Sequence, residues 1–101
     1  MSGYRLSSEA IADLTEIRNH LADAVGPRVT RYILSEIRKA LRFLSSTPGA
    51  GHRREDLTDQ PVKFWPVLSF LIVYDPGMRP IGVARVLHAS RDVASLLRTP
   101  P

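Results

Sequence analysis

The stretch "SFLIVYDPGMRPIGVARVLH", residues 69–88, decides the fold of this 101-residue chain. It opens with an apolar run, Ser69 to Asp75, breaks at "PGMRP", and resumes as a second run, Ile81 to His88. Runs of this length that are rich in β-branched residues and separated by proline and glycine predict two β-strands joined by a turn. The first run is apolar at nearly every position, so we expect it to be the central strand of a small sheet.

Two further strand candidates lie upstream of this pair. The segment "VKFWPV", Val62 to Val67, has strand composition, and Pro66 marks either its end or a position at the edge of the sheet. Phe64 and Trp65 are consecutive, so their side chains point to opposite faces of a strand. We expect one of them in the core and the other exposed for a partner. The segment "YRL", residues 4–6, is short and extended.

Two helices are predicted between the first strand and the others. Apolar residues recur at helical spacing in two sets: Ala10, Leu14, Ile17, Leu21 and Ala24, then Val29, Ile33, Ile37, Ala40 and Leu44. Ser7 or Ser8 can cap the first helix. Gly26-Pro27 separates the two helices, because glycine suits a helix end and proline a first turn. The short link predicts an antiparallel helical hairpin, and Pro48 predicts where it ends.

The whole chain, residues 1–101, is expected to form one α+β domain. Its predicted element order is β-α-α-β-β-β-(α), with a polar loop from Ser45 to about Pro61 and a short last helix that starts near Ser90. The helical hairpin should cover one face of a small antiparallel sheet. The other face would then be partly open, and open apolar surface of that kind usually binds a protein.

The composition narrows the classes of function. Zero cysteines exclude disulfides and thiolate metal sites, and three scattered histidines do not form a metal set, so we expect neither a metal nor another cofactor. No apolar run of membrane-spanning length occurs and no signal pattern opens the chain, so we expect a cytoplasmic protein without a membrane contact. The formal net charge is +4, and 12 of the 14 basic residues are arginine. This balance favours an anionic partner, either an acidic protein or a nucleic acid.

Four phrases stand in an order that is typical of one family. They are "YRLSSEAIADLTEI" (residues 4–17), "ALRFLSSTPGAGHRREDL" (residues 40–57), "LIVYD" (residues 71–75) and "RVLHASRD" (residues 85–92). Together they resemble the ParE/RelE superfamily of toxins from type II toxin–antitoxin systems, and the ParE branch more closely. The resemblance covers nearly the whole chain. It departs from the family at Ala89-Ser90, where Gly-Ala is common, and at Asp75, where an arginine often follows the tyrosine.

The resemblance implies a RelE/ParE-like fold and a toxin. A ParE-like toxin inhibits DNA gyrase by protein contact, and a cognate acidic ParD-like antitoxin neutralises it by wrapping a disordered tail around it in a hetero-oligomer. Direct sequence-specific DNA binding by this chain is not expected. Two alternatives stay open: a RelE-like ribosome-dependent mRNA interferase, which would be an endoribonuclease, and a non-toxic relative that keeps antitoxin binding. Whether the chain is an enzyme therefore depends on the branch.

Two sets of candidate residues follow. Cleavage of RNA needs a base, cations around the phosphorus and a proton donor, and the candidates are His88, Arg85 and Arg53 if the chain is a ribonuclease. Contacts with antitoxin or target are assigned to cationic and aromatic side chains: Arg31, Arg38, Arg42, Arg53, Arg54, Trp65, Tyr74, Arg85 and Arg91.

Structural roles are the alternative for the residues near the C-terminus. His88 is expected to form a hydrogen bond that orders the corner between the last strand and the last helix. Arg91 and Asp92 should lie in the first turn of that helix, where the helix dipole favours the aspartate. Arg53 and Arg54 are either contacts for an anionic partner or part of a solvated loop.

Arg85 has two possible roles. By strand alternation it should share a face with Val83 and Leu87. On that face it would either contact a partner or form a partly buried ion pair with Asp75 or Asp92.

Overall fold

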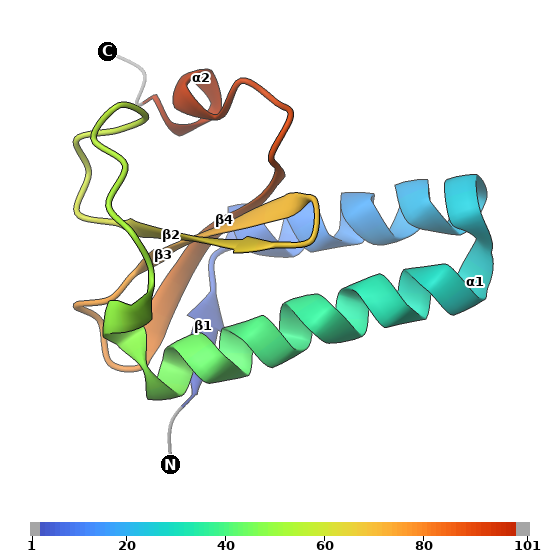
Figure 1. The fold of residues 1–101 in the computed structure, drawn as a ribbon, viewed down its shortest axis with the longest axis horizontal. Coiled ribbons are helices and arrows are strands. Elements are labelled where there is room, and N and C mark those ends of the chain that lie inside the picture. The colour runs from blue at the N-terminus through green and yellow to red at the C-terminus, as the bar shows by residue number, and fades with distance from the viewer. Residues whose placement is uncertain (1–2, 99–101) are drawn as a thin grey trace.

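The computed structural model of the protein describes residues 3–98. Its elements are β1 (Tyr4–Leu6), α1 (Ser8–Ser46), a short 3₁₀ turn η1 (Pro48–Ala50), β2 (Lys63–Val67), β3 (Phe70–Asp75), β4 (Ile81–His88) and α2 (Val93–Leu97). Figure 1 shows α1 folded back on itself on one side of a four-stranded sheet, with α2 on the other side. The predicted α+β fold class and element order are confirmed.

α1 is a helical hairpin and not one straight helix. Gly26 has φ 82° and ψ 174°, a backbone conformation that essentially only glycine adopts. It divides α1 into a first arm, residues 8–25, and a second arm, residues 27–46. Pro27 opens the second arm, where its missing N–H costs no helical hydrogen bond. Ser7 Oγ caps the first arm by accepting a backbone N–H at 3.0 Å. The predicted break and hairpin are therefore confirmed.

The sheet is mixed, with strand order β1-β4-β3-β2. β3 pairs antiparallel with both β2 and β4, whereas β1 pairs parallel with β4. The expectation of a purely antiparallel sheet is wrong for β1, because a strand of three residues is too short for its side-chain pattern to report a direction. β2 is the other edge strand, and the edge position predicted for Pro66 is confirmed.

β1 covers only the beginning of β4. It pairs with residues 81–83, so the rest of that edge of β4 has no strand partner. Side chains from the start of the helical hairpin fill this place. Ser7 Oγ donates to the Ala84 carbonyl at 2.7 Å, and Asp13 Oδ2 accepts from the Val86 N–H at 3.0 Å. These bonds satisfy backbone groups that an open sheet edge would leave exposed.

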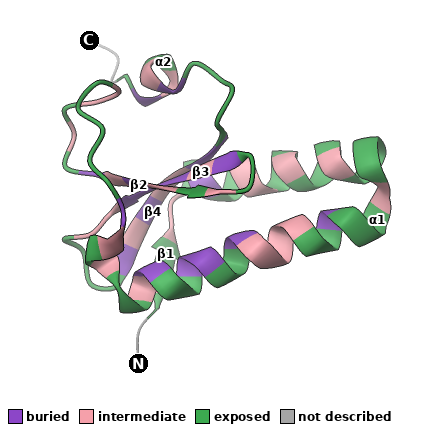
Figure 2. Ribbon diagram, in the orientation of Figure 1, coloured by how far each residue is buried: buried purple, intermediate pink, exposed green. Residues whose placement is uncertain are grey.

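The sheet is covered on both faces (Figure 2). Against α1 lies a buried cluster of Ala10, Ile37, Ala40, Leu41, Leu44, Phe70, Ile72, Tyr74, Ile81, Val83 and Val86. On the opposite face lies a second cluster of Val62, Phe64, Val73, Leu87, Val93 and Leu97. Because α2 supplies Val93 and Leu97, the expectation of a partly open sheet face is wrong.

A β-bulge changes which side chains share a face of β4. The pairing of β3 with β4 shifts register and skips Ala84. As a result Val83 and Val86 both lie in the cluster against α1, while Leu87 lies in the cluster on the opposite face. The prediction that Arg85 shares a face with both Val83 and Leu87 is therefore wrong.

Among residues 3–98, no group of three or more histidine, cysteine, aspartate or glutamate side chains is placed to hold a metal ion. Even the long α1 lacks the hydropathy that a helix needs to cross a membrane, and the same holds for the other helix in this range.

Candidate protein-interaction site

A groove runs between the two arms of α1 beside β1, and we call it the arginine groove. It has a volume of about 280 Å³ and is lined by Tyr4, Leu6, Ile11, Leu14, Thr15, Arg18, Leu34, Ile37, Arg38 and Leu41. Leu14, Leu34 and Ile37 are at least partly buried, whereas Arg18 and Arg38 are exposed, one on each arm. The groove thus combines an apolar floor with a cation on each side.

The cations of the second arm extend this basic surface. Arg31, Arg38 and Arg42 are exposed and lie seven and four residues apart, so they share one side of the arm. Among residues 3–98, no carboxylate forms an ion pair with any of these three or with Arg18. Arg18 was missed in the sequence, although it follows Ile11 and Leu14 at helical spacing.

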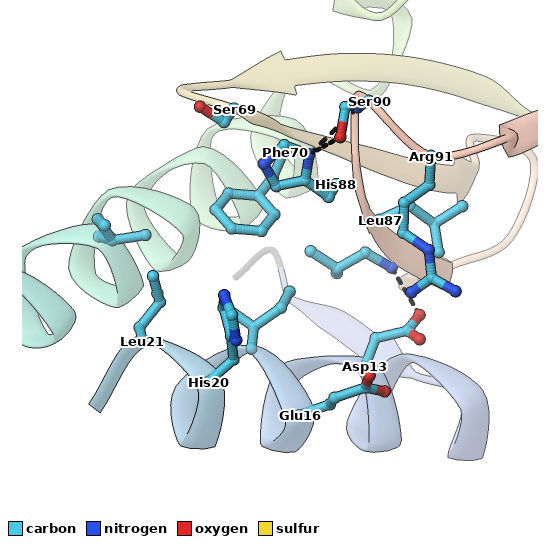
Figure 3. A pocket seen from close by; sticks show the side chains of 13 residues that line it. Asp13, Glu16, His20, Leu21, Ser69, Phe70, Leu87, His88, Ser90 and Arg91 are labelled. Atoms are coloured by element: carbon cyan, nitrogen blue, oxygen red, sulfur yellow. Dashed lines mark hydrogen bonds between the residues drawn. The ribbon is translucent and has the colours of Figure 1, made fainter. Parts of the chain in front are cut away.

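A second hollow, the His88 cleft, lies between the first arm and the ends of β3 and β4 (Figure 3). It has a volume of about 420 Å³ and is lined by Asp13, Glu16, Ile17, His20, Leu21, Ile33, Ser69, Phe70, Val86, Leu87, His88, Ser90 and Arg91. In Figure 3 the Phe70 ring points into the cleft between His20 and His88. Its lining is mainly apolar, with ionisable side chains at the margin.

His88 orders the corner after β4, as predicted. Its Nδ1 accepts the Ser90 N–H at 3.1 Å and lies 2.7 Å from Ser90 Oγ, and the His88 and Phe70 rings pack edge to face with centroids 5.3 Å apart. Since Nδ1 is an acceptor, the neutral ring carries its proton on Nε2.

α2 begins at Val93, with Asp92 as its N-cap. Arg91 therefore precedes the helix, and the prediction that it lies in the first turn is wrong.

Arg85 is an internal tie. Its Nε and Nη2 donate to Asp13 Oδ2 at 2.7 Å and Oδ1 at 2.9 Å, and its Nη1 donates to the Leu96 carbonyl at 3.4 Å. The hydrogen bond to Asp13 raises the pKa of Arg85. The predicted partners Asp75 and Asp92 are wrong. Arg85 therefore joins the first arm of α1, β4 and α2, and its guanidinium is engaged inside the fold.

Arg53 and Arg54 lie on an exposed loop outside β2. Arg54 Nη2 is paired with Asp56 Oδ2 at 2.8 Å, and this pairing raises the pKa of Arg54. The neighbouring His52 bridges to Phe64, and β2 and β3 separate this point from β4. At about 4.8 Å per strand, Arg53 is on the order of 14 Å from Arg85 along the sheet. The three ribonuclease candidates are thus not brought together.

Trp65 is half-buried and packs on the surface between two other rings. Its centroid lies 5.3 Å from that of Phe43 and 6.5 Å from that of His52. Phe64 is 2% exposed in the core, so the two consecutive aromatic residues do face opposite sides, as predicted.

Tyr74 is a core residue, so the prediction that its side chain contacts a partner is wrong. The side chain is 0% exposed. Its hydroxyl donates to the Pro48 carbonyl at 2.7 Å and accepts the Gly51 N–H at 2.9 Å. A Cβ at Gly51 would lie 2.5 Å from the hydroxyl oxygen, so only glycine fits there. Tyr74 therefore fastens the segment after α1 to the sheet.

Replacing Tyr74 with phenylalanine should lower the free energy of unfolding by about 1–3 kcal/mol, because the buried Gly51 N–H and the partly buried Pro48 carbonyl lose their partner. Burial raises the pKa of Tyr74, and the bond from Gly51 opposes this. Folding therefore favours the neutral Tyr74 hydroxyl. Its contribution to the free energy of unfolding is complete below about pH 10 and is lost as the pH rises through the raised pKa of the folded state. Urea unfolding at pH 7 and above pH 10 checks this.

The matched control for this substitution is Tyr32→Phe, since Tyr32 is 56% exposed. Its effect should stay within about 0.5 kcal/mol at pH 7. An equal loss of stability in both variants would contradict the role given to Tyr74.

A comparison of the sequence with protein-family models identifies the family. Residues 4–93 match the family model described as "ParE toxin of type II toxin-antitoxin system, parDE". The chain therefore belongs to the ParE toxin family. No curated protein sequence matches the chain.

A solved structure has a similar fold. It is described as "Chromosomal ParDE TA system from P. aeruginosa", and it superposes with a TM-score of 0.75 at 20% sequence identity. The alignment covers 89% of this chain and 98% of that chain. At this identity the similarity concerns the fold alone.

Proposed function

We propose that this chain is a ParE-type toxin that inhibits DNA gyrase by protein contact and is neutralised by an acidic ParD-like antitoxin. Membership of the ParE toxin family supports the toxin role. The arginine groove is the observation that carries the antitoxin role, because it offers an apolar floor between two cations that no described carboxylate neutralises. The solved neighbour, described as a ParDE system, agrees with this pairing.

The groove suits an acidic, amphipathic segment. Apolar side chains of such a segment would enter between the arms against Leu14 and Leu34, while its carboxylates would meet Arg18 and Arg38. Arg31 and Arg42 would extend the contact along the second arm. A disordered tail that folds on binding can follow a curved surface of this kind, with part of the binding energy spent on ordering.

The gyrase contact is proposed for the end of the molecule around the His88 cleft. This cleft lies between the first arm and the tips of β3 and β4, and Phe70 forms part of its apolar floor. Arg91 and His88 at its margin are exposed. Burial of an apolar floor inside a polar margin is the usual composition of a protein interface.

The mRNA interferase has less support than the gyrase inhibitor. Cleavage would need His88, Arg85 and Arg53 around one phosphate. Arg85 is engaged by Asp13, and Arg53 lies on the outer side of β2. The non-toxic relative differs from both in having no cellular target.

A supercoiling and cleavage assay with purified DNA gyrase tests the proposal. The chain should abolish supercoiling and trap cleaved DNA, and the same chain saturated with its antitoxin should do neither. Growth arrest without a gyrase effect, together with cut mRNA on ribosomes, would favour the interferase. Neither arrest nor a gyrase effect would favour the non-toxic relative.

A further inference from the structure

The outer side of the second arm carries a stripe that α1 and the sheet leave uncovered, and we call it the aromatic seam. Its members are Val29, Tyr32, Glu36, Lys39, Phe43 and Ser46, which are spaced alternately by three and four residues. This is the spacing of the contact positions in a coiled coil. Val29, Tyr32 and Phe43 are 43%, 56% and 45% exposed. A helix face with this spacing and these exposed side chains can pack against another helix.

The seam is nearly symmetric about its centre, between Ile37 and Arg38. An aromatic residue stands at each end, Tyr32 and Phe43, and an acid and a base stand inside them, Glu36 and Lys39. A two-fold axis at this centre would bring the Tyr32 ring of one copy onto Phe43 of the other. The same operation would place each Glu36 against Lys39 of the other copy. This is the self-complementarity that a two-fold interface requires.

We infer that this chain forms an antiparallel homodimer through the aromatic seam, with a second copy of itself as the occupant. A parallel arrangement is disfavoured, because it would place Glu36 on Glu36 and Lys39 on Lys39. Within one chain the Lys39 Nζ and Glu36 Oε2 atoms already lie 2.8 Å apart, with side chains 64% and 27% exposed. In the antiparallel dimer two such pairs join into a ring of alternating charges that fixes direction and register.

The seam differs from the arginine groove in position as well as in charge. Arg38 lines the groove together with Leu34 and Leu41, whereas the seam lies on the side of the second arm that reaches Trp65 through Phe43. The half-buried Trp65 would form part of the margin of the dimer. Both surfaces can therefore be occupied together, so the dimer does not depend on the proposed antitoxin contact.

The expected affinity is moderate. From Val29 to Ser46 the seam is about 26 Å long at 1.5 Å per residue. One helix pair of that length gives an interface near the lower limit for specific association. The dimer should therefore dissociate in the micromolar range, and a polar central layer lowers stability in exchange for a fixed direction.

Charge exchange between two variants tests this dimer. In Glu36→Lys both central positions are lysine, and in Lys39→Glu both are glutamate. Each variant alone should self-associate at least 10-fold more weakly than the parent chain, because the central charges repel. An equimolar mixture should form a heterodimer, since every cross-contact then joins opposite charges. Sedimentation velocity from about 1 to 200 μM measures the association of the full-length parent chain, of each variant and of the equimolar mixture.

Circular dichroism of each variant establishes that it is folded, so that dissociation is separated from unfolding. Arg98→Glu, which makes the same charge change as Lys39→Glu at an exposed position beside α2, should dimerise like the parent chain. A parent chain that stays monomeric at 200 μM would overturn the inference. It would equally be overturned if the folded mixture showed no more association than its two components.

Discussion

Replacing Asp13 with alanine lowers the free energy of unfolding by about 2–4 kcal/mol. The Asp13 carboxylate binds the Arg85 guanidinium at 2.7 and 2.9 Å and accepts the Val86 N–H at 3.0 Å. Without it Arg85 keeps only the Leu96 carbonyl at 3.4 Å, and the Val86 N–H loses its partner beside the bulge. The Asp13 and Arg85 side chains are 11% and 23% exposed, so the loss should be smaller than for a fully buried pair.

Urea unfolding at neutral pH measures this loss, and Asp56→Ala is the matched control. Asp56 also binds an arginine through two oxygens, but its side chain is 63% exposed, so its removal should lower the free energy of unfolding far less than the removal of Asp13. The single variants Asp13→Ala and Arg85→Met and the double variant form a double-mutant cycle. The coupling energy of this cycle reports the contribution of the ion pair itself. Similar losses for Asp13→Ala and Asp56→Ala would show that the tie does not hold the fold together.

The helical hairpin and the central strands could be predicted because their signals are local. Gly26-Pro27 interrupts two stretches of helical periodicity, and the structure turns at that position. The last strand occupies Ile81–His88, as its run of apolar residues predicts. In such segments one short window of sequence contains both the pattern and the residues that end it.

The Asp13–Arg85 pair could not be predicted, because its members are 72 residues apart in the sequence. Strand alternation placed Val83, Arg85 and Leu87 on one face, but a bulge at Ala84 shifts the period, so Val83 faces α1 and Leu87 faces the opposite side. From its residue type alone, Tyr74 was predicted to contact a partner at the surface. Its burial depends on Pro48 and Gly51, which the fold brings to its hydroxyl from another segment.

The arginine groove also combines a part that could be predicted from the sequence with a part that could not. Arg38 was predicted as a contact residue from the exposed side of its own helix, and the structure places it at the groove. Arg18 belongs to the other arm, so only the pairing of the arms reveals that the two cations line one groove. The groove is therefore a property of the hairpin and cannot be read from either helix alone.

We expect Arg38→Glu to weaken binding of the proposed acidic antitoxin about 100-fold, which corresponds to roughly 2.7 kcal/mol at 25 °C. The substitution removes an attraction at the margin of the arginine groove and places a like charge against an acidic segment. Arg18→Glu acts on the other arm in the same way. Because the two positions are on separate arms, their effects should add, so the double variant should bind on the order of 10,000-fold more weakly.

Titration calorimetry with the purified cognate antitoxin measures these affinities. Arg98→Glu makes the same change of charge beside α2, away from the groove, and should leave the affinity within about 3-fold of the parent chain. Raising the salt from 0.1 to 0.5 M should weaken the parent complex more than that of Arg38→Glu, because screening acts on the attraction that the variant has lost. If Arg38→Glu and Arg98→Glu bind equally well, the antitoxin docks outside the arginine groove.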